Sequence, residues 1–344
     1  MGYLQKKGYK QEKRGRKMVN KKLKVVITDA EYPSFGSEKK VLSQCNVNLV
    51  KYQCATEKEL ISKCKDADAL LNQYAKITAN VIEHLDHVKI IARYGIGVDN
   101  VDLDAATQKN IFVTNVVYDI CDVADHTIML MLALTRKIFL MDKSIRKGEW
   151  DWKKFHPIPR IKGKTVGIIG LGRVGRQVAR RLQGFDVHLL ACDPYISTDV
   201  FKTYNAKQVD HKTLLEQSDI VTIHVPLTKE TRNMISTNEL KMMKKKVILI
   251  NAARGGIVDE KALLNALKKR EIAGAGLDVL EHEPIHKDNL LLSCDNVIIT
   301  PHMGWYSEDT VDEVQRIAAE QVLQCLQGKV PTNLVNKEVL KRMR

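Results

Sequence analysis

The sequence has no apolar stretch long enough to cross a membrane. Its longest uninterrupted apolar run, Ile128 to Leu134, is far shorter than the roughly 20 residues that a transmembrane helix needs. The N-terminus carries positive charge but lacks the apolar segment of a secretory signal. We therefore expect a cytoplasmic protein without membrane contacts.

Cysteine motifs are also absent. The seven cysteines are odd in number and are nowhere spaced as CxxC. This pattern argues for reduced thiols and against a disulfide framework or a zinc site, so we predict no metal centre.

Basic charge is abundant but unevenly distributed. The formal net charge is +14, and residues 1–24 hold ten Lys or Arg and one acid, Glu12, which leaves +5 for the rest of the chain. We predict that residues 1–21 are a disordered, solvated tail and that nucleic acid is not a partner. Met18 is an alternative start. Nonspecific attraction of the tail to polyanions remains the other interpretation.

Beyond the tail, short apolar runs alternate with helical patterns. A chain of 344 residues exceeds what one hydrophobic core usually serves, so we expect two domains. The alternation predicts βαβ units on parallel sheets. The predicted strands are 23–27, 47–50, 69–71, 88–91 and 111–113 in a first series, and 165–169, 187–191, 220–224, 247–250, 275–278 and 297–299 in a second.

Four helices matter for the organisation of the chain. Two are expected in the first series, within 56–65 and 78–85. Residues 123–146 contain neither Gly nor Pro and predict one long apolar helix between the two series. The amphipathic stretch 308–327 follows the last strand and should return to the first domain.

A glycine-rich stretch joins a predicted strand to a predicted helix. Residues 166–175 read VGIIGLGRVG and contain GxGxxG, which is a weak pattern in isolation. Here Gly170 would permit a tight turn, Gly172 the approach of a pyrophosphate, and Gly175 close packing of helix on strand. The helix N-terminus at Arg173 and Val174 would then face the phosphates.

Asp193 ends the second strand of this series, 18 residues after Gly175. A carboxylate there accepts hydrogen bonds from ribose hydroxyls and repels a 2′-phosphate, so NAD is favoured over NADP. The alternative is a turn cap formed by the Asp193-Pro194 pair.

Unusual polar residues follow three further strands. Arg254 comes after the strand at 247–250, the carboxylates Asp278, Glu281 and Glu283 end or follow the next, and His302 follows the last. Because ligands gather outside the carboxyl ends of parallel strands, these side chains should converge on one crevice.

Together these motifs resemble the D-isomer-specific 2-hydroxyacid dehydrogenases, which include phosphoglycerate, glycerate and formate dehydrogenases. The resemblance covers about Leu23 to Val335 and rests on GLGRVG, HVPLTKETRNMI, NAARGGIVDE, GLDVLEHEP and TPHMGWYS. The sequence is most similar to the C-terminal-binding-protein-like and phosphoglycerate dehydrogenase-like branch, through RYGIGVDNVD, VADHTIMLMLALTRK and HMGWYSE.

The resemblance implies three catalytic residues. Arg254 would hold the substrate carboxylate and polarise its carbonyl, a task that suits a fixed guanidinium. His302 would be the general acid/base and Glu283 its partner, since a carboxylate beside an imidazole favours the protonated ring. Glu281 is near, but the register of the motif favours Glu283. Further residues that the resemblance places at the cofactor are Thr127, His224, Pro226, Thr231, Ala252, Asp278 and Gly304.

The stretch RYGIG, comprising Arg93, Tyr94, Gly95, Ile96 and Gly97, resembles the substrate loop of the family. The glycines would free backbone N–H groups to bind a carboxylate, and Arg93 would add charge. Tyr94 contacts substrate or merely packs. Trp305 would line the substrate pocket and favour an apolar or extended 2-oxo acid, or else pack between the domains.

The implied fold is α/β with two Rossmann-like domains. Residues 22–118 and 306–344 would form a discontinuous, flavodoxin-like substrate domain, and residues 119–305 a doubly wound NAD-binding domain, with the active site between them. The implied function is reversible hydride transfer between NAD and a D-2-hydroxy or 2-oxo acid by a homodimer. The rival is an NAD(H)-responsive protein-interaction module similar to the corepressors of that branch.

Overall fold

The computed structural model describes residues 22–343, so the predicted tail at 1–21 lies outside the described residues. The chain forms two compact units. The first unit contains the residues up to Val117 together with those from Val314, and the second unit is Tyr118–Glu313. The sequence boundaries at 118/119 and 305/306 lie one and eight residues away from these divisions.

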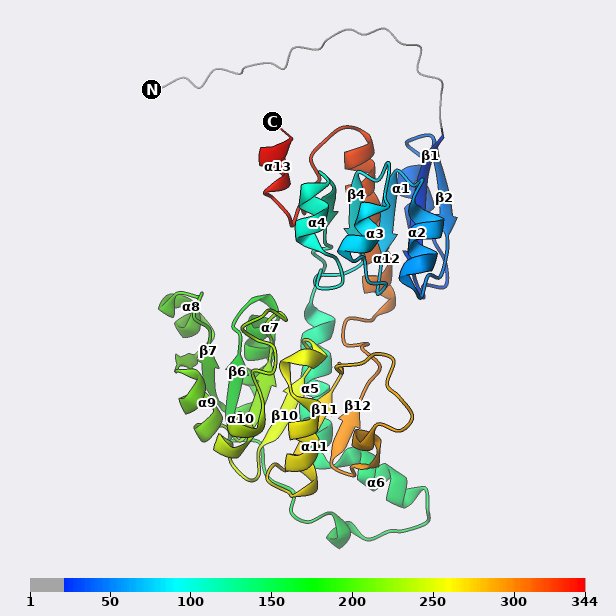
Figure 1. Cartoon of the computed structure of the whole chain (residues 1–344). Helices are drawn as coiled ribbons and strands as arrows, with labels where there is room; N and C mark the ends of the chain where they lie inside the picture. The colour runs from blue at the N-terminus through cyan, green and yellow to red at the C-terminus, as the bar shows by residue number, and fades with distance from the viewer. Residues whose placement is uncertain (1–21, 344) are drawn as a thin grey trace, which may run out of the picture. The chain divides into compact units, whose positions relative to one another are not determined.

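The first unit is a parallel five-stranded sheet in the order β2-β1-β3-β4-β5, which is the flavodoxin-like order (Figure 1). Buried side chains such as Val26, Leu70 and Ile91 come from its central strands. Its strands are β1 (Leu23–Asp29), β2 (Val47–Lys51), β3 (Ala69–Asn72), β4 (Ile90–Arg93) and β5 (Phe112–Thr114), and its helices are α1 (Gly36–Leu42), α2 (Glu57–Cys64), α3 (Ala79–Glu83), α4 (Leu103–Gln108) and α13 (Val339–Arg342).

The C-terminal segment completes the first unit. Leu334 forms an antiparallel bridge to Thr114 at the outer strand β5. Asn336 accepts a hydrogen bond from the Val113 amide at 2.8 Å. From α12 (Glu308–Leu326), Gln315 donates to the buried carboxylate of Glu38. The end of the chain therefore packs with strands and helices formed near its beginning.

The second unit is a parallel seven-stranded sheet in the order β12-β11-β10-β9-β6-β7-β8. Counted from β6, this is the doubly wound order 3-2-1-4-5-6 with a seventh strand added, and it reverses between β6 and β9. Its strands are β6 (Thr165–Ile169), β7 (His188–Cys192), β8 (Ala206–Gln208), β9 (Ile220–Ile223), β10 (Ile248–Asn251), β11 (Gly274–Leu277) and β12 (Val297–Ile299).

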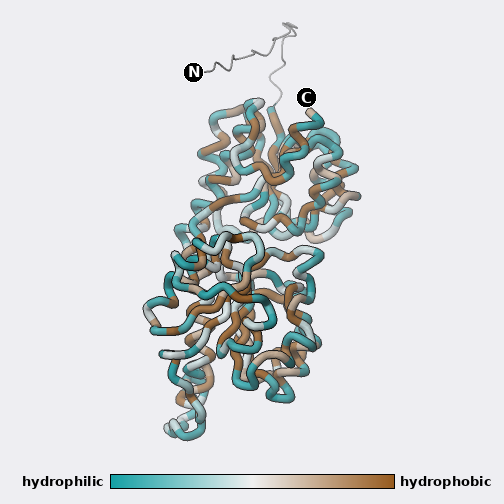
Figure 2. Tube along the Cα trace, turned by 90° about the vertical axis from the view of Figure 1, so that its left-hand side faces the viewer, coloured by the Kyte–Doolittle hydropathy of each residue, from teal (hydrophilic) through white to brown (hydrophobic). Residues whose placement is uncertain are grey.

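Helices cover both faces of this sheet. Alternate strand residues point to opposite faces, so Ile248 and Ile250 pack with α5 and α7, whereas Leu249 packs with α9 and α11. Figure 2 shows the apolar segments running through the interior of the unit. The remaining elements are α5 (Cys121–Arg136), α6 (Ile138–Ile145), η1 (Trp152–Phe155), α7 (Arg173–Leu182), η2 (Gln183–Phe185), α8 (Thr198–Thr203), α9 (His211–Gln217), α10 (Thr237–Met242), η3 (Gly255–Ile257), α11 (Glu260–Lys268) and η4 (Leu290–Ser293).

The α/β fold is confirmed, and every predicted strand is present to within two residues of its expected bounds. Two details were wrong. The strand β8 was not predicted, because it has three residues and lies at the sheet edge. The single helix expected at 123–146 is two helices, since Lys137 adopts a left-handed conformation with φ 54° and ends α5.

None of the helices within residues 22–343 is long and apolar enough to span a bilayer. All seven cysteines lie in this range and are free thiols.

Candidate active site

The glycine-rich turn connects β6 to α7 at the point where the sheet order reverses. Gly170 has φ 91°, and a Cβ there would lie 2.6 Å from the carbonyl oxygen of His224. A Cβ on Gly175 would lie 2.1 Å from the carbonyl oxygen of Gly170. The predicted geometry of a tight turn and of close helix–strand packing is therefore confirmed.

The same turn leaves room for a ligand. Apart from Gly172 itself and its two chain neighbours, no heavy atom of residues 22–343 lies within 4 Å of the position that a Cβ on Gly172 would take. Arg173 and Val174 open the ten-residue helix α7, whose first amides have no partner within the helix. The Arg173 guanidinium donates to the Tyr118 carbonyl at 2.8 Å. The space and the free amides fit a pyrophosphate.

Asp193 follows β7 and accepts two backbone hydrogen bonds. Its Oδ2 accepts from the Leu171 amide in the glycine turn and its Oδ1 from the Tyr195 amide, both at 2.9 Å. It therefore forms the turn considered as an alternative and also contacts the glycine-rich turn. A cavity of about 600 Å³ beside it is lined by Cys192, Asp193, Pro194, Gln208, Val209, Asp210 and Thr213.

The histidine at the end of β12 is paired with a carboxylate. The Nδ1 atom of His302 lies 2.7 Å from Oε2 of Glu283, and the other oxygen of Glu283 accepts from the Leu280 amide at 2.9 Å. Glu281 instead accepts from the Glu260 amide at 3.1 Å. Of the two glutamates considered from the sequence, the structure brings Glu283 to the histidine.

Arg254 follows β10, the neighbour of β11, and is half-buried. Asn251 donates to its carbonyl at 2.8 Å, and its guanidinium donates to the carbonyl of Ala253, also at 2.8 Å. A Cβ on the next residue, Gly255, would lie 1.9 Å from the carbonyl carbon of Leu280. The loops after β10 and β11 therefore touch, and a glycine is required where they meet.

Asp278 lies beneath the histidine loop and is buried. Its carboxylate accepts from the amides of Met303 and Gly304 at 2.9 and 2.8 Å, and its carbonyl accepts from the His302 amide at 2.8 Å. Although burial opposes ionisation, the hydrogen bonds of His126 and Thr300 and of these amides hold the pKa of Asp278 below its ordinary value. The carboxylate therefore remains charged and organises the loop.

Two partners of Asp278 were missed at the level of sequence. His126, from α5, and the Thr300 hydroxyl both contact its Oδ1 atom. Thr300 was part of the TPH motif and His126 part of VADHT, but a lone histidine in an apolar helix gives no signal that distinguishes it from core packing.

Other residues assigned to the cofactor have varied contacts. Burial lowers the pKa of His224 to about 3, and its Nε2 atom lies 2.9 Å from the Thr222 hydroxyl. Thr231 donates to the Pro226 carbonyl at 2.6 Å and thereby holds a surface turn. Ala252 is half-buried directly after β10. Thr127 is 1% exposed, and its hydroxyl donates to Val123 in its own helix.

The RYGIG loop belongs to the first unit. Tyr94 is buried, donates to Glu38 at 2.7 Å and packs edge-on against Tyr32, which supports the packing alternative. The Gly95 amide donates to the Arg93 carbonyl at 2.9 Å. The sequence predicts that this amide is free to bind a carboxylate, but it already has a partner within the loop. The Ile96 carbonyl accepts from Asn115. Gly97 and Arg93 are half-buried.

Trp305 belongs to the second unit and is half-buried. Its ring meets Tyr306 edge-on, with 5.7 Å between the ring centroids. Gly304, just before it, is buried against Asp278 and has no room for a side chain, since a Cβ would lie 2.9 Å from Oδ2.

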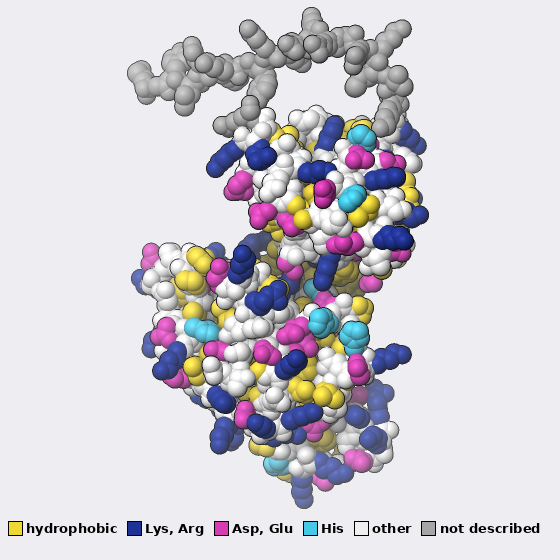
Figure 3. Space-filling view, viewed as in Figure 1, with side chains coloured by type: hydrophobic (Ala, Val, Ile, Leu, Met, Phe, Trp, Pro, Cys, Tyr) yellow, Lys and Arg dark blue, Asp and Glu magenta, His cyan; other side chains and the backbone are white. Residues whose placement is uncertain are grey.

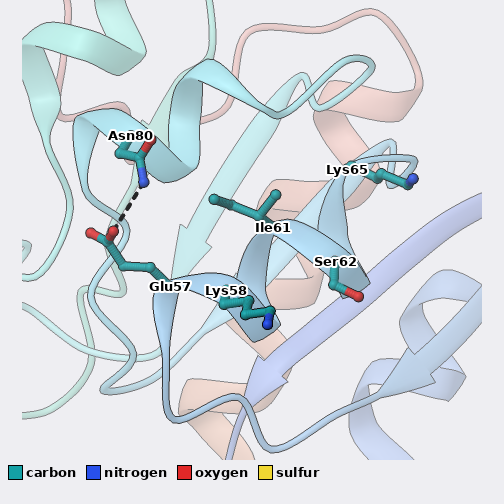
Figure 4. Close-up of a pocket in the computed structure, with 6 residues that line it drawn as sticks. All are labelled: Glu57, Lys58, Ile61, Ser62, Lys65 and Asn80. Carbon is teal, nitrogen blue, oxygen red and sulfur yellow. Dashed lines mark hydrogen bonds between the residues drawn. The ribbon is translucent and has the colours of Figure 1, made fainter.

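The first unit also has a shallow groove of about 570 Å³ between α2 and α3 (Figure 4). Glu57 accepts hydrogen bonds there from Asn80 at 3.0 Å and from Thr78. The other lining residues are Lys58, Ile61, Ser62 and Lys65. Since the carboxylate is already satisfied, this groove offers no acid–base chemistry comparable with the histidine pair.

Residues 128–304 match the family model described as the NAD binding domain of D-isomer specific 2-hydroxyacid dehydrogenases. The chain is 40% identical to the glyoxylate reductase of Korarchaeum cryptofilum, over 92% of this chain and 97% of that protein. It is 45% identical to the D-3-phosphoglycerate dehydrogenase of Methanocaldococcus jannaschii over 82% of this chain, but it spans only 54% of that relative.

The chain is also similar to solved structures of 2-hydroxyacid dehydrogenases. The D-lactate dehydrogenase from Aquifex aeolicus, complexed with NAD and lactic acid, superposes with a TM-score of 0.80 at 28% identity and covers 92% of this chain and 98% of its own. Both the predicted similarity to the phosphoglycerate dehydrogenase-like branch and the predicted cofactor, NAD, are confirmed.

Proposed function

Because the chain belongs to the D-isomer specific 2-hydroxyacid dehydrogenases, we propose that it transfers hydride reversibly between NAD and a D-2-hydroxy acid or its 2-oxo acid. The observation that carries this proposal is the 2.7 Å contact between His302 and Glu283. The contact lies at the carboxyl ends of adjacent strands, one strand from the loop that carries Arg254. Reduction of a 2-oxo acid requires an acid–base group to protonate the carbonyl oxygen and a fixed cation to bind the neighbouring carboxylate.

The cofactor NAD supplies or accepts the hydride when bound. Gly172 and the first amides of α7 would bind its pyrophosphate, and Asp193 would accept hydrogen bonds from the ribose. Two acidic residues, Asp193 and Asp210, line the adjoining cavity. Their negative charge opposes a 2′-phosphate, which supports use of NAD rather than NADP.

His302 acts as the acid in reduction and as the base in oxidation. Its Nδ1 atom is held by Glu283, so Nε2 is the nitrogen that can exchange a proton with the substrate oxygen. The carboxylate stabilises the ring when it carries both protons. Arg254 would bind the substrate carboxylate with two N–H groups and polarise the carbonyl.

The experiment is NADH oxidation, followed by absorbance, with glyoxylate, hydroxypyruvate, phosphohydroxypyruvate and branched 2-oxo acids. His302→Asn and Arg254→Lys are measured beside the parent. We expect turnover with at least one acid and its loss in His302→Asn, with NADH binding retained. NADH binding without any turnover would refute the enzyme and favour the NAD-responsive interaction module.

We also propose that the active protein is a homodimer formed through the second unit. Large apolar side chains are exposed between α5 and β6, including Trp150 at 89%, Trp152 at 70% and Ile138 at 54%. Such a patch is characteristic of a protein interface. Within the apolar stretch of α5, Leu130, Met131 and Leu134 are buried in the core, whereas Met129 is 42% exposed.

The distribution of charge favours a small-molecule substrate. On the face shown in Figure 3, Lys and Arg side chains are interspersed with Asp and Glu over both units. Nucleic-acid binding would be supported by a continuous basic stripe.

A further inference from the structure

His126 is a histidine in the otherwise mostly apolar helix α5. Its side chain is 12% exposed, and its Nε2 atom lies 2.9 Å from the Thr300 hydroxyl and 3.3 Å from Oδ1 of Asp278. The mechanism described above does not use this residue. Its position is therefore not explained by direct contact with the reacting groups.

The directions of these hydrogen bonds are fixed by chemistry. Thr300 donates its hydroxyl hydrogen to Oδ1 of Asp278 at 2.6 Å, because a carboxylate of lowered pKa can only accept. The Thr300 oxygen must then accept from His126, which requires a hydrogen on Nε2. His126, Thr300 and Asp278 thus form a chain of donors that ends on the carboxylate.

That carboxylate determines the shape of the loop that carries His302. Asp278 accepts from the Met303 and Gly304 amides, and its carbonyl accepts from His302 itself. His302 has φ 52°, a left-handed conformation that costs an ordinary residue about 1 kcal/mol or more. The hydrogen bonds that the loop amides donate to Asp278 hold the backbone in this conformation and thereby set the direction of the imidazole.

His126 also packs against the turn. A Cβ on Gly304 would lie 3.4 Å from Cδ2 of His126 and 2.9 Å from Oδ2 of Asp278. The ring therefore lies beside the carboxylate that binds the loop amides. His126 and Asp278 also both form hydrogen bonds with the hydroxyl of Thr300, which is two residues before His302.

We propose that His126 is a positioning residue for His302, acting through Thr300 and Asp278. It keeps the loop of residues 300–304 in the one conformation in which His302 meets both Glu283 and the substrate oxygen. This inference rests on the proposed function, since it assigns a supporting residue to the same acid–base group.

The test compares variants that remove the donor with variants that restore it. His126→Leu has no donor, whereas His126→Gln places an amide N–H near the former Nε2 atom. Thr300→Val breaks the next link and Thr300→Ser keeps it. Thr135→Val removes a buried hydroxyl elsewhere in α5 and serves as the matched control, since Thr135 donates only to its own helix at Met131.

For each variant we would measure kcat, the KM for NADH, the melting temperature and the primary isotope effect with deuterated NADH. His126→Leu and Thr300→Val should each lower kcat about tenfold and raise the isotope effect, because hydride and proton transfer become slower. His126→Gln and Thr300→Ser should recover most of the loss. The double variant should be no slower than either single variant, since both break one chain.

Two results that involve His126 variants would overturn the inference. One is a lowered melting temperature in His126→Leu with kcat and isotope effect as in the parent. The other is full additivity of the two substitutions. If His126→Leu does not fold, Thr300→Val, Thr300→Ser and His126→Gln still test the link. Turnover retained by His302→Asn would instead refute the proposed function. If His302→Asn loses turnover but Thr300→Val has the same kcat as the parent, only this inference is refuted.

Discussion

His302 and Glu283 are 19 residues apart in sequence, yet Nδ1 of one lies 2.7 Å from Oε2 of the other. The side chains are only 22% and 35% exposed, so solvent screens their interaction incompletely. The Leu280 amide fixes the second oxygen of Glu283. The carboxylate is thereby held in place before the substrate binds.

Replacing Glu283 by Gln should slow catalysis without unfolding the protein. The amide keeps the size and can still accept from Nδ1, but it lacks the charge that stabilises the protonated ring. We expect kcat for reduction to fall on the order of tenfold to a hundredfold. Steady-state kinetics of parent and variant with NADH and a 2-oxo acid measure this loss. A variant with the kcat of the parent would contradict the electrostatic role.

Gly175→Ala should destabilise the second unit. The added Cβ would lie 2.1 Å from the Gly170 carbonyl oxygen, so α7 must move away from β6. A cost of roughly 1–3 kcal/mol is expected from overpacking, measured by urea denaturation. Gly184→Ala is the matched control, because no atom lies within 4 Å of its added Cβ. Equal stability of the two variants would show that the close packing is unimportant.

Gly172→Ala should behave in the opposite way. The added methyl group meets no protein atom within 4 Å, so the melting temperature should not change. It does occupy the space assigned to the pyrophosphate, and we expect NADH to bind about tenfold more weakly, ~1.4 kcal/mol. Fluorescence titration of NADH measures this. Unchanged affinity would place the pyrophosphate elsewhere.

Acid should destabilise the protein through His224. Burial lowers its pKa to about 3, whereas the ordinary pKa of a histidine is 6.5, so the unfolded chain binds more protons between these pH values. The stability from this group is complete above pH 6.5 and is lost as pH falls toward 3. By linkage, about 2 kcal/mol should disappear between pH 7 and pH 5.

The measurement is urea denaturation at both pH values for the parent and for His224→Gln. The difference in the free energy of unfolding between the parent and His224→Gln should be about 2 kcal/mol smaller at the lower pH. The exposed His188→Gln controls for the removal of a histidine as such. A parent and a His224→Gln variant with the same pH dependence would contradict the assignment.

Replacing Trp150 and Trp152 together by Ser should dissociate the proposed dimer. The two residues are 89% and 70% exposed in a single copy of the chain. Their replacement should therefore change the stability of the folded monomer little. Light scattering after size exclusion should report a dimer for the parent and a monomer for the double variant. A dimeric variant, or a monomeric parent, would refute this interface.

Periodicity predicted every strand except β8, and motif position indicated which polar residues follow the strand ends. Buried parallel strands produce nearly continuous apolar runs, and their carboxyl ends are adjacent whatever loops join them. This is why Arg254, Glu283 and His302 could be grouped without knowledge of a distance.

What the sequence could not reveal depends on single backbone conformations or on partners far along the chain. Lys137 ends α5 without a glycine or proline, so no residue type signalled the break. His126 meets Thr300 across 174 positions. The Gly95 amide is used by the Arg93 carbonyl, which only the turn geometry could show.

The return of the C-terminal segment to the first unit sets the order in which the chain can fold during synthesis. Glu38 is made early, but Gln315, which donates to its buried carboxylate, follows 277 positions later. The Val113 amide likewise donates to Asn336, which follows 223 positions later in the sequence. The second unit is continuous and can fold as it emerges, whereas the first keeps an open sheet edge until Leu334 and Asn336 have been made. The first unit therefore begins before the second unit and is completed after it.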